Sequence, residues 1–286
     1  MDLNPEALFV LIPGFGRPNI DHKFSLLVNN LTVLSRLCDT QLFHKIYLTI
    51  CLYDTDSTVE ASAERIETLF ALFRDQFPNR FEFALHCAPG IVGQFMLRHA
   101  APSALKGLDA SISYCMLLLD DVELNAIEWT PHTWQRVFQD YKRHRLSILS
   151  PTLTPNSKYL FPYMLQRKFP GGTDVLTITS ACEMFCYLMS FDIWERYVAE
   201  LRDDHPLLWG IDLVLTKHLG FRVGMIHYGS VRHHYQSVQD PTNPATTEAF
   251  RQMEHYLSKF NETQQSLAHQ PAVLEEIHIY HRTKIV

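Results

Sequence analysis

The sequence predicts an α/β protein in which a mostly parallel central sheet is flanked by helices. Two patterns support this fold class. Short apolar runs alternate with amphipathic helical segments through the first half of the chain, and the central run, Tyr114 to Leu119, is apolar without interruption. Alternation of this kind produces right-handed βαβ units and therefore a parallel sheet. A continuous apolar run is typical of a strand that is buried on both faces of such a sheet.

Three strands and three helices are expected before that central strand. The expected strands cover residues 8–12, 45–53 and 81–86. Apolar residues at helical spacing predict helices over residues 24–37 and 59–77, and a third helix begins near Gly90. Each of the first strands is therefore followed by a helix that returns the chain to the sheet.

The alternation loosens after the central strand. Helical spacing continues over residues 134–141, and a strand is expected at 146–151. Residues 154–174 contain three prolines and a Gly-Gly pair, so we expect a long irregular segment, of the kind that is usually a functional lid or mobile. The remaining expected elements are an apolar run at 181–190, helices at 191–201 and 211–218, a last core strand at 222–227, and a helical C-terminal tail around 250–260.

Composition and charge narrow the class of protein. The chain has 286 residues, and 47% of them are hydrophobic, which is ample for a buried core. No window of the sequence approaches the roughly 20 consecutive apolar residues of a membrane span. Acidic residues stand where a signal peptide needs basic ones, so we expect a cytoplasmic protein. The net charge of −6 argues against nucleic acid as a partner, and six cysteines without a CxxC pair argue against a disulfide framework or a zinc site.

Three acidic residues, Asp120, Asp121 and Glu123, follow the central strand. Ligands of parallel sheets bind at the carboxyl ends of the strands. If the extended conformation persists past Leu119, its two-residue period puts Asp121 and Glu123 on one side and Asp120 on the other. Two carboxylates that face one way suit Mg²⁺ or Mn²⁺. The alternative is an ordinary solvated strand end.

Other strand ends carry further candidates. The first strand runs into Pro13-Gly14-Phe15-Gly16-Arg17, where the backbone can approach a ligand closely. No third glycine follows at dinucleotide-binding spacing, so a plain turn is the alternative to nucleotide contact. The second strand runs into Asp54. The helix near Gly90 carries Gln94 and Arg98, and a helix N-terminus beside strand ends favours a phosphate, although Arg98 taken alone also fits a solvated helix charge.

Two acids lie in apolar surroundings in the second half of the chain. Glu183 is the one charged residue of the run at 181–190, and a charge in such a run is expected to be paired or functional. Asp212 lies about 100° round its helix from Ile211, off the buried stripe, so it can face the strand ends. The alternative is that Asp212 only caps its own helix or pairs with a neighbour such as Arg232. Trp209 offers a flat apolar surface on which a sugar ring can stack, or else it anchors the core.

The order of these features resembles the nucleotide-sugar-dependent glycosyltransferases of the GT-A fold, and also a less well described family of GT-A-like domains in plants and bacteria. The features are the acidic cluster, the aromatic-Gly-x-Asp sequence at 209–212, and the strand that leads to His233 and His234. The resemblance covers roughly Leu8 to His234. It implies one GT-A-like domain with a smaller mixed region on the acceptor side. Its parts are a nucleotide-binding half at about 1–125, an acceptor and metal-completing half at about 126–240, and a C-terminal tail at 241–286.

The resemblance also implies roles for individual residues. Asp121-Val122-Glu123 would take the place of the Asp-x-Asp motif that holds the nucleotide ribose and a divalent metal, with Glu as the third member. His233, with His234 as its rival, would complete the metal sphere. Asp212 would be the general base, and Glu183 is the next candidate for that role.

Binding residues follow from the same resemblance. The sugar substrate would contact Trp209 and Gly210. The nucleotide would contact Pro13, Gly14, Phe15, Arg17, Asp54, Gln94, Arg98, Asp120 and Asp121.

The implied activity is transfer of a sugar from a nucleoside diphosphate sugar to a carbohydrate or other hydroxyl acceptor. Uridine diphosphate is the expected carrier because it is frequent in the family. The expected cofactor is Mn²⁺ or Mg²⁺, since a divalent ion stabilises a departing diphosphate as a Lewis acid. A carboxylate must also lie near the acceptor hydroxyl to take its proton. The alternatives on the same scaffold are a metal-dependent phosphohydrolase or nucleotidyltransferase, and a non-catalytic binding protein.

Overall fold

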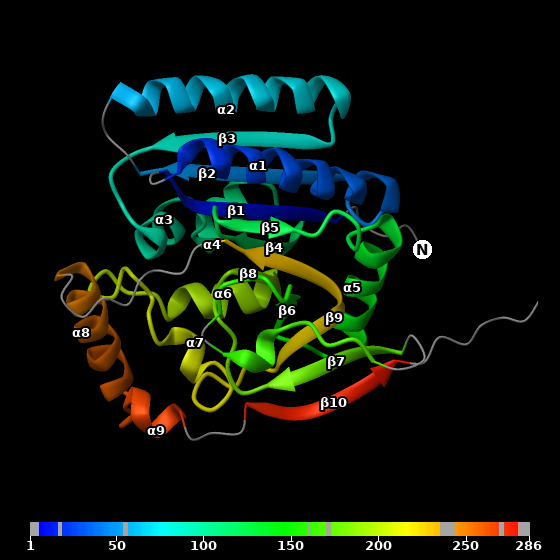
Figure 1. The fold of residues 1–286 in the computed structure, drawn as a ribbon. Coiled ribbons are helices and arrows are strands. Elements are labelled where there is room, and N and C mark those ends of the chain that lie inside the picture. The colour runs from blue at the N-terminus through cyan, green and yellow to red at the C-terminus, as the bar shows by residue number, and fades with distance from the viewer. Residues whose placement is uncertain are drawn as a thin grey trace, which may run out of the picture.

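The computed structural model describes residues 6–16, 19–53, 57–159, 161–169, 173–234, 244–268 and 272–279. Within this part of the chain, one large sheet lies between helices on both of its faces (Figure 1). The predicted fold class, an α/β protein with a mostly parallel central sheet flanked by helices, is therefore confirmed.

Strands and helices alternate in the first half, as the sequence predicts. The elements are β1 (Ala7–Phe15), α1 (Ile20–Ser35), η1 (Arg36–Thr40), β2 (Lys45–Leu52), α2 (Ser57–Gln76), β3 (Phe81–Cys87), α3 (Val92–His99), α4 (Pro102–Leu108) and β4 (Ile112–Leu118). β1, β2, β3 and β4 are mutually parallel. β4 is the predicted central strand, and its residues from Tyr114 to Leu118 are all buried, which explains the unbroken apolar run.

The second half is less regular. Its elements are β5 (Val122–Leu124), α5 (Pro131–Arg143), β6 (Ile148–Leu153), η2 (Pro162–Met164), β7 (Asp174–Thr179), β8 (Cys186–Ser190), α6 (Phe191–Ala199), α7 (Ile211–Val214), β9 (Val223–His233), α8 (Pro244–Ser258), α9 (Gln264–Ala268) and β10 (Val273–Ile279). The helix expected at 211–218 is shorter, because α7 ends at Val214. The segment 241–286, expected to be a tail, contributes α8, α9 and the sheet strand β10.

The strand order of the sheet is β10-β7-β9-β6-β8-β4-β1-β2-β3, and β5 pairs with β9 beside this path. β8 is antiparallel to β4 and to β6, whereas β9 is parallel to β6. β6 and β9 therefore run in the same direction as β4. β7 and β5 are antiparallel to β9, so the reversed strands gather in the second half. The carboxyl ends of β1, β2, β4, β6 and β9 consequently share one edge of the sheet.

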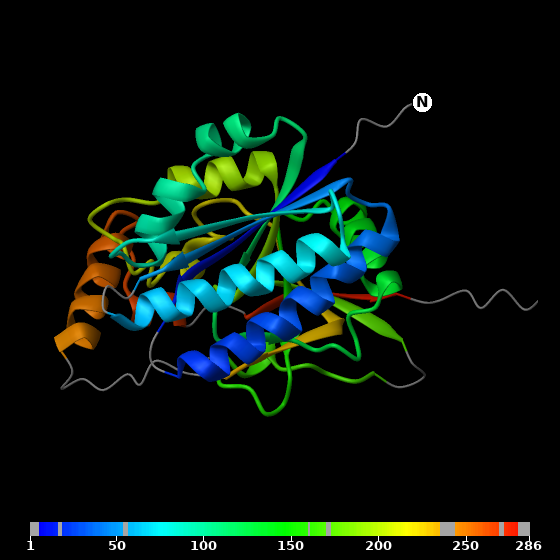
Figure 2. The ribbon, with the colours of Figure 1, turned by 90° about the horizontal axis from the view of Figure 1, so that it is seen from above.

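Figure 2 shows α1 and α2 along one face of the sheet, and α4 and α6 along the other. α1 buries Leu27, Leu31 and Leu34, which recur at helical spacing. On the same helix, the Asn30 side chain donates to the carbonyl oxygen of Val122 at 2.7 Å and accepts from the amide of Leu124 at 2.8 Å. These two bonds fix β5 against α1, directly beside the acidic cluster.

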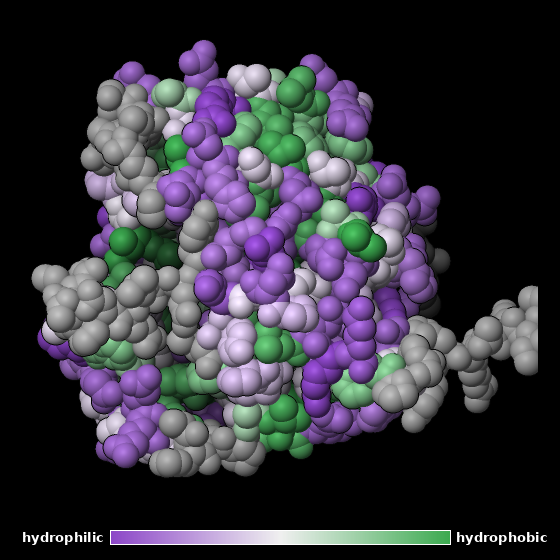
Figure 3. All heavy atoms as spheres, in the orientation of Figure 1, coloured by the Kyte–Doolittle hydropathy of each residue, from purple (hydrophilic) through white to green (hydrophobic). Residues whose placement is uncertain are grey.

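Figure 3 shows polar residues over most of one face, with apolar side chains in small separate patches. In the described ranges, no helix has the length and hydropathy that crossing a bilayer requires.

One assumption about the acidic cluster is wrong. The chain turns at Asp120 and Asp121 rather than continuing as a strand, and the amide of Val122 donates to the carbonyl of Leu119 at 3.3 Å. The two-residue period therefore does not run through the cluster, and each acid takes a different partner.

Candidate functional site

Several acidic residues gather at the edge where the parallel strands end. Asp120 and Asp121 follow β4, and His233 ends β9. Glu183 lies just before β8, which begins opposite the end of β4 because Cys186 pairs with Leu118. β5 then pairs with β9 so that Val122 lies opposite His233. This pairing brings residues more than 100 positions apart in sequence into one site.

Asp121 and His233 form the centre of the site. Nε2 of His233 lies 3.3 Å from Oδ2 of Asp121. The other ring nitrogen, Nδ1, lies 3.1 Å from the carbonyl oxygen of Lys158, which assigns the proton to Nδ1 when the ring is neutral. Burial lowers the pKa of His233, but the hydrogen bond and charge of Asp121 and the charge of Glu183 outweigh burial and raise it.

The second carboxylate oxygen of Asp121 is buried and has no hydrogen-bond partner among the described residues. An orphaned carboxylate oxygen in a buried position is costly unless something binds it. Two ligand atoms on neighbouring positions of an octahedral Mg²⁺ lie about 3 Å apart, because each is roughly 2.1 Å from the ion. The 3.3 Å separation between Asp121 and His233 is close to that spacing.

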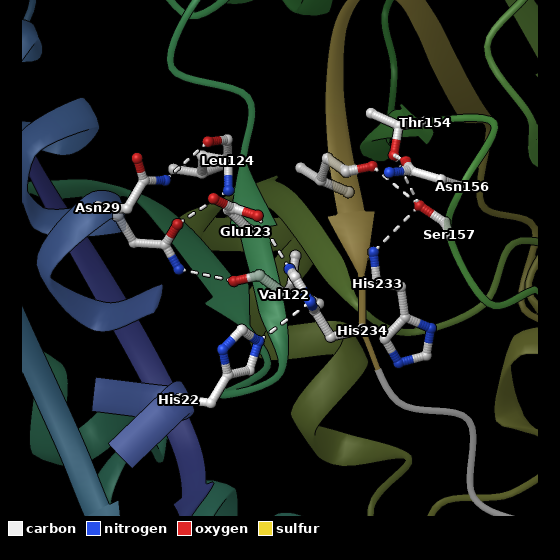
Figure 4. A network of polar contacts seen from close by, with 12 residues as sticks. His22, Asn29, Val122, Glu123, Leu124, Thr154, Asn156, Ser157, His233 and His234 are labelled. Atoms are coloured by element: carbon white, nitrogen blue, oxygen red, sulfur yellow. Dashed lines mark hydrogen bonds and ion pairs between the residues drawn. The ribbon is translucent and has the colours of Figure 1, made fainter. Parts of the chain in front are cut away.

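Glu123 is directed to a different partner (Figure 4). Its Oε2 lies 2.9 Å from Nε2 of His234, and Nδ1 of His234 lies 3.1 Å from Nε2 of His22. His233 is the last residue of β9 and His234 follows it, and the two side chains take different acidic partners, Asp121 and Glu123. No group of three histidine, cysteine or acidic side chains that could hold a metal ion by itself occurs in the described ranges.

Asp120 is paired with a lysine rather than with a histidine. Its Oδ2 lies 2.6 Å from Nζ of Lys23 and accepts a hydrogen bond from the amide of Gly16 at 3.3 Å. Burial raises the pKa of Asp120 to about 7, although the charge of Lys23 works in the opposite direction. Sequence reasoning missed Lys23. The signal was available, since Lys23 shares the buried stripe of α1 with Leu27 and Leu34, where a lysine requires an acidic partner.

Glu183 and Asp212 form an acidic pair, and the charge of Glu183 also acts on His233. Glu183 is 9% exposed and accepts a hydrogen bond from the amide of Phe161 at 3.3 Å. Burial and the negative charge of Glu183 raise the pKa of Asp212 to about 7, despite backbone amides at the start of α7 that lower it. A carboxylate whose pKa lies near neutrality can take up and release a proton at physiological pH.

Two of the expected nucleotide contacts lie inside the core. Pro13 is buried, and Phe15 is 1% exposed. Gly14 between them is half-buried with a φ of +80°, a conformation that favours glycine, and a Cβ there would meet Tyr53 at 3.8 Å. The expected loop is therefore the end of β1, and among its described residues 13–16 Gly14 is the partly accessible one. Arg17 and Asp54 lie outside the described residues.

The expected phosphate site at the start of α3 is covered. The Gln94 side chain accepts from the amide of Ile91 at 3.3 Å, and the amide of Gly93 donates to the carbonyl of Pro206 at 3.0 Å. Arg98 is exposed and donates to the carbonyl of Pro89 at 3.3 Å. The structure therefore does not bring these groups together with Asp121.

Trp209 and Gly210 pack against α8. The ring of Trp209 meets that of Phe250 edge to face at 5.4 Å. Gly210 has a φ of +90°, and a Cβ there would lie 2.8 Å from Cγ of Met253. Gly210 thus allows both the turn into α7 and the close approach of α8, which places Asp212.

Comparisons with known proteins give fold-level likenesses only. No protein-family model matches the chain, and no curated protein matches it. Among solved structures, it is similar to a UDP-glucose pyrophosphorylase complexed with UDP-glucose, with 9% identity, 90% of this chain and 99% of that chain covered, and a TM-score of 0.43. It is also similar to the inositol-1-phosphate CTP transferase from T. maritima, with 10% identity, 87% and 96% coverage, and a TM-score of 0.41.

A third similar structure is the 4-diphosphocytidyl-2C-methyl-D-erythritol synthase from Anaerococcus prevotii, with 10% identity, 90% and 97% coverage, and a TM-score of 0.38. The names of these three proteins describe enzymes that act on nucleotides. At TM-scores below 0.5, we base no assignment of activity on these likenesses.

Proposed function

We propose that this protein is a divalent-metal-dependent glycosyltransferase that moves a sugar from a nucleoside diphosphate to a hydroxyl acceptor. The observation that supports the proposal is the electrostatic link through Glu183, whose charge acts on both Asp212 and His233. Burial and this charge raise the pKa of Asp212 to about 7, and His233 in turn contacts Asp121. An enzyme of this kind needs both a base for the acceptor and a place for the departing diphosphate.

Asp121 and His233 are the residues that would hold the metal ion. The orphaned Oδ1 of Asp121 and the 3.3 Å spacing of the two side chains fit such an ion. Two protein ligands leave most of an octahedral sphere open, which suits an ion that binds together with a nucleotide diphosphate. When bound, it would neutralise the charge that develops on the departing diphosphate. Glu123, implied as a ligand by the resemblance, pairs with His234 in this structure.

Asp212 would act on the acceptor. As the acceptor oxygen forms its bond to the anomeric carbon and the bond from that carbon to the diphosphate breaks, the proton of the acceptor hydroxyl passes to Asp212. Burial and the charge of Glu183 raise the pKa of Asp212, which makes Asp212 a stronger base than a solvated aspartate. If Asp212 is not the base, Glu183 is the next candidate, because Glu183 is buried and its charge acts on Asp212.

The charge beside Asp212 favours a neutral acceptor. The second substrate of a nucleotidyltransferase carries a phosphate group, an anion that requires cationic side chains. Lys23 is already paired with Asp120, and Arg232 of β9 lies opposite Glu123. The neighbour whose charge acts on Asp212 is the acid Glu183. An uncharged hydroxyl compound meets these two acids without electrostatic repulsion.

Product analysis tests the proposal. The protein is incubated with Mg²⁺ and each of several UDP- and GDP-sugars, with and without hydroxyl acceptors, and the products are identified by mass spectrometry. Glycosylated acceptor together with free nucleoside diphosphate supports glycosyl transfer. Nucleoside triphosphate and sugar 1-phosphate, formed on addition of pyrophosphate, would instead identify a nucleotidyltransferase. Nucleoside monophosphate with sugar 1-phosphate would identify a phosphohydrolase, and binding without turnover would identify a binding protein.

A further inference from the structure

The irregular segment after β6 lies directly against the site. We call residues 154–159 and 161–167 the strap. At its start, the amide of Lys158 donates to the carbonyl of His233 at 2.9 Å, and the amide of His233 donates to Oγ of Ser157 at 3.1 Å. Figure 4 shows Thr154, Asn156 and Ser157 clustered beside His233. The strap is thus joined by backbone hydrogen bonds to the end of β9.

The other end of the strap is also fixed. The amide of Gln166 donates to the carbonyl of Leu153 at 2.7 Å, and its side chain donates to both carboxylate oxygens of Glu128 at 2.9 and 3.0 Å. The amide of Arg167 donates to Nδ1 of His227 at 3.1 Å. The described residues of the strap are therefore held at both ends.

Two aromatic side chains occupy the middle of the strap. Phe161 and Tyr163 are half-buried, and their rings stack with centroids 5.5 Å apart and planes 24° apart. The amide of Phe161 donates to Glu183, and the hydroxyl of Tyr163 donates to the carbonyl of Ala181 at 2.9 Å. Burial, together with the nearby charges of Cys182, Asp212 and Glu183, raises the pKa of Tyr163. The backbone of Phe161 and the side chain of Tyr163 therefore lie near the acidic pair.

We propose that Phe161 and Tyr163 form the acceptor subsite, and that its ligand is an uncharged sugar ring. The apolar face of the ring would stack on the partly exposed aromatic side chains, and one of its hydroxyl groups would point toward Glu183 and Asp212. Aromatic rings supply a large rigid apolar surface, and nearby polar groups fix the orientation of a ligand. This inference rests on the proposed function, which supplies the role of Asp212.

The chemistry of the surroundings selects among ring compounds. A phosphate or carboxylate on the ring would be repelled by Glu183 and Asp212. A small flexible polyol such as glycerol has hydroxyl groups but no flat apolar face, so it gains nothing from the two rings. The subsite therefore distinguishes an uncharged hexose ring from both of these classes.

Saturation-transfer NMR tests the subsite with defined probes. The full-length protein, with UDP and Mg²⁺, is mixed with the methyl glycosides of glucose, galactose and mannose, with glucose 6-phosphate, or with glycerol. At least one methyl glycoside is expected to receive saturation at its ring C–H protons, while glucose 6-phosphate and glycerol do not. Phe161→Ala and Tyr163→Ala should each weaken glycoside binding about tenfold or more, as the loss of a stacking partner does.

Two variants serve as controls. Tyr163→Phe keeps the ring and should keep glycoside binding. Phe169→Ala removes an aromatic side chain from just beyond the strap, where Phe169 contacts His227 and His278 at 5.7 and 5.8 Å, and it should also leave binding unchanged. Calorimetry with UDP and Mg²⁺ should give the same affinity in all variants, which checks that each one is folded.

The inference is overturned if no methyl glycoside binds, if glycerol binds as well as the glycosides, or if Phe161→Ala and Tyr163→Ala bind like the wild type. Failure of the proposed function has a different signature. In that case UDP and Mg²⁺ do not bind or no sugar is transferred, whatever the response of Phe161 and Tyr163 to glycosides.

Discussion

His233 ends β9 with its Nε2 3.3 Å from Oδ2 of Asp121, a residue 112 positions earlier in the chain. The contact is set by backbone pairing, because Val122 of β5 lies opposite His233 and Asn30 of α1 holds β5 from its other side. The metal-binding role that we propose for this pair therefore depends on β5. This strand is short, and its contacts with β9 and α1 keep it in place.

The first prediction concerns the metal. Asp121→Asn should remove the rise in UDP affinity that Mg²⁺ or Mn²⁺ produces, since a neutral amide is a poor ligand for a hard cation. Glu123→Gln should retain it, because Glu123 pairs with His234. Isothermal titration of UDP with and without metal measures both effects. Loss of the metal effect in Glu123→Gln, with the effect intact in Asp121→Asn, would transfer the ligand role to Glu123.

The second prediction concerns the pH dependence of transfer. As a base, Asp212 must be ionised, so kcat/KM should rise with pH through about 7, the pKa that burial and Glu183 give it. Glu183→Gln removes the neighbouring negative charge and should move this rise to lower pH. The profile is measured from pH 5 to 9 in wild type and variant. An identical midpoint in both would show that Glu183 does not tune the base.

The third prediction concerns stability. The folded-state pKa of Asp212 is raised from 3.8 to about 7, so the folded protein retains a proton that the unfolded chain releases. The free energy of unfolding therefore falls as the pH rises between these two values. Asp212→Asn removes this loss and should raise the melting temperature at pH 8 but have little effect at pH 4. A melting temperature of Asp212→Asn below that of the wild type at pH 8 would mean that the charged carboxylate stabilises the fold.

The fourth prediction concerns Lys23 and Asp120. Their side chains are 8% and 12% exposed, so Lys23→Met leaves a buried carboxylate without its partner. Removal of one member of such a pair typically costs about 3 to 5 kcal/mol. Adding Asp120→Asn should recover much of that loss, and urea unfolding of both single variants and the double variant measures the coupling. Additive losses would show that the two side chains do not stabilise one another.

The first half of the fold could be predicted because β1, β2 and β4 are almost wholly buried and helices connect the successive strands. β7 and β10 were missed for physical reasons. β7 begins at Asp174, at the end of a stretch rich in proline and glycine, and β10 is an edge strand whose Leu274, Glu275 and Glu276 are exposed, so it lacks apolar alternation. Strand pairing rather than local pattern determines both elements.

Part of the candidate site could also be predicted from the strands. Asp121 and His233 both stand at the carboxyl ends of apolar strands, and such ends meet at one edge of a parallel sheet. The turn at Asp120 and Asp121 could not be read from the sequence, because three acids after a strand fit both a turn and a continued strand. That turn is what directs Glu123 to His234 and Asp120 to Lys23.

The most direct measurement is the rate of sugar transfer by Asp212→Asn, with Asp203→Asn as the matched control on an exposed aspartate. Asparagine has nearly the same shape as aspartate but cannot take the proton of the acceptor. The account predicts that Asp212→Asn binds UDP and metal like the wild type and loses about 10²- to 10⁴-fold in transfer rate, while Asp203→Asn transfers normally. Transfer by Asp212→Asn within a few-fold of the wild type, with UDP binding intact, would contradict Asp212 as the base. If Glu183→Gln were also active, the assignment of this site to direct-displacement glycosyl transfer would be wrong.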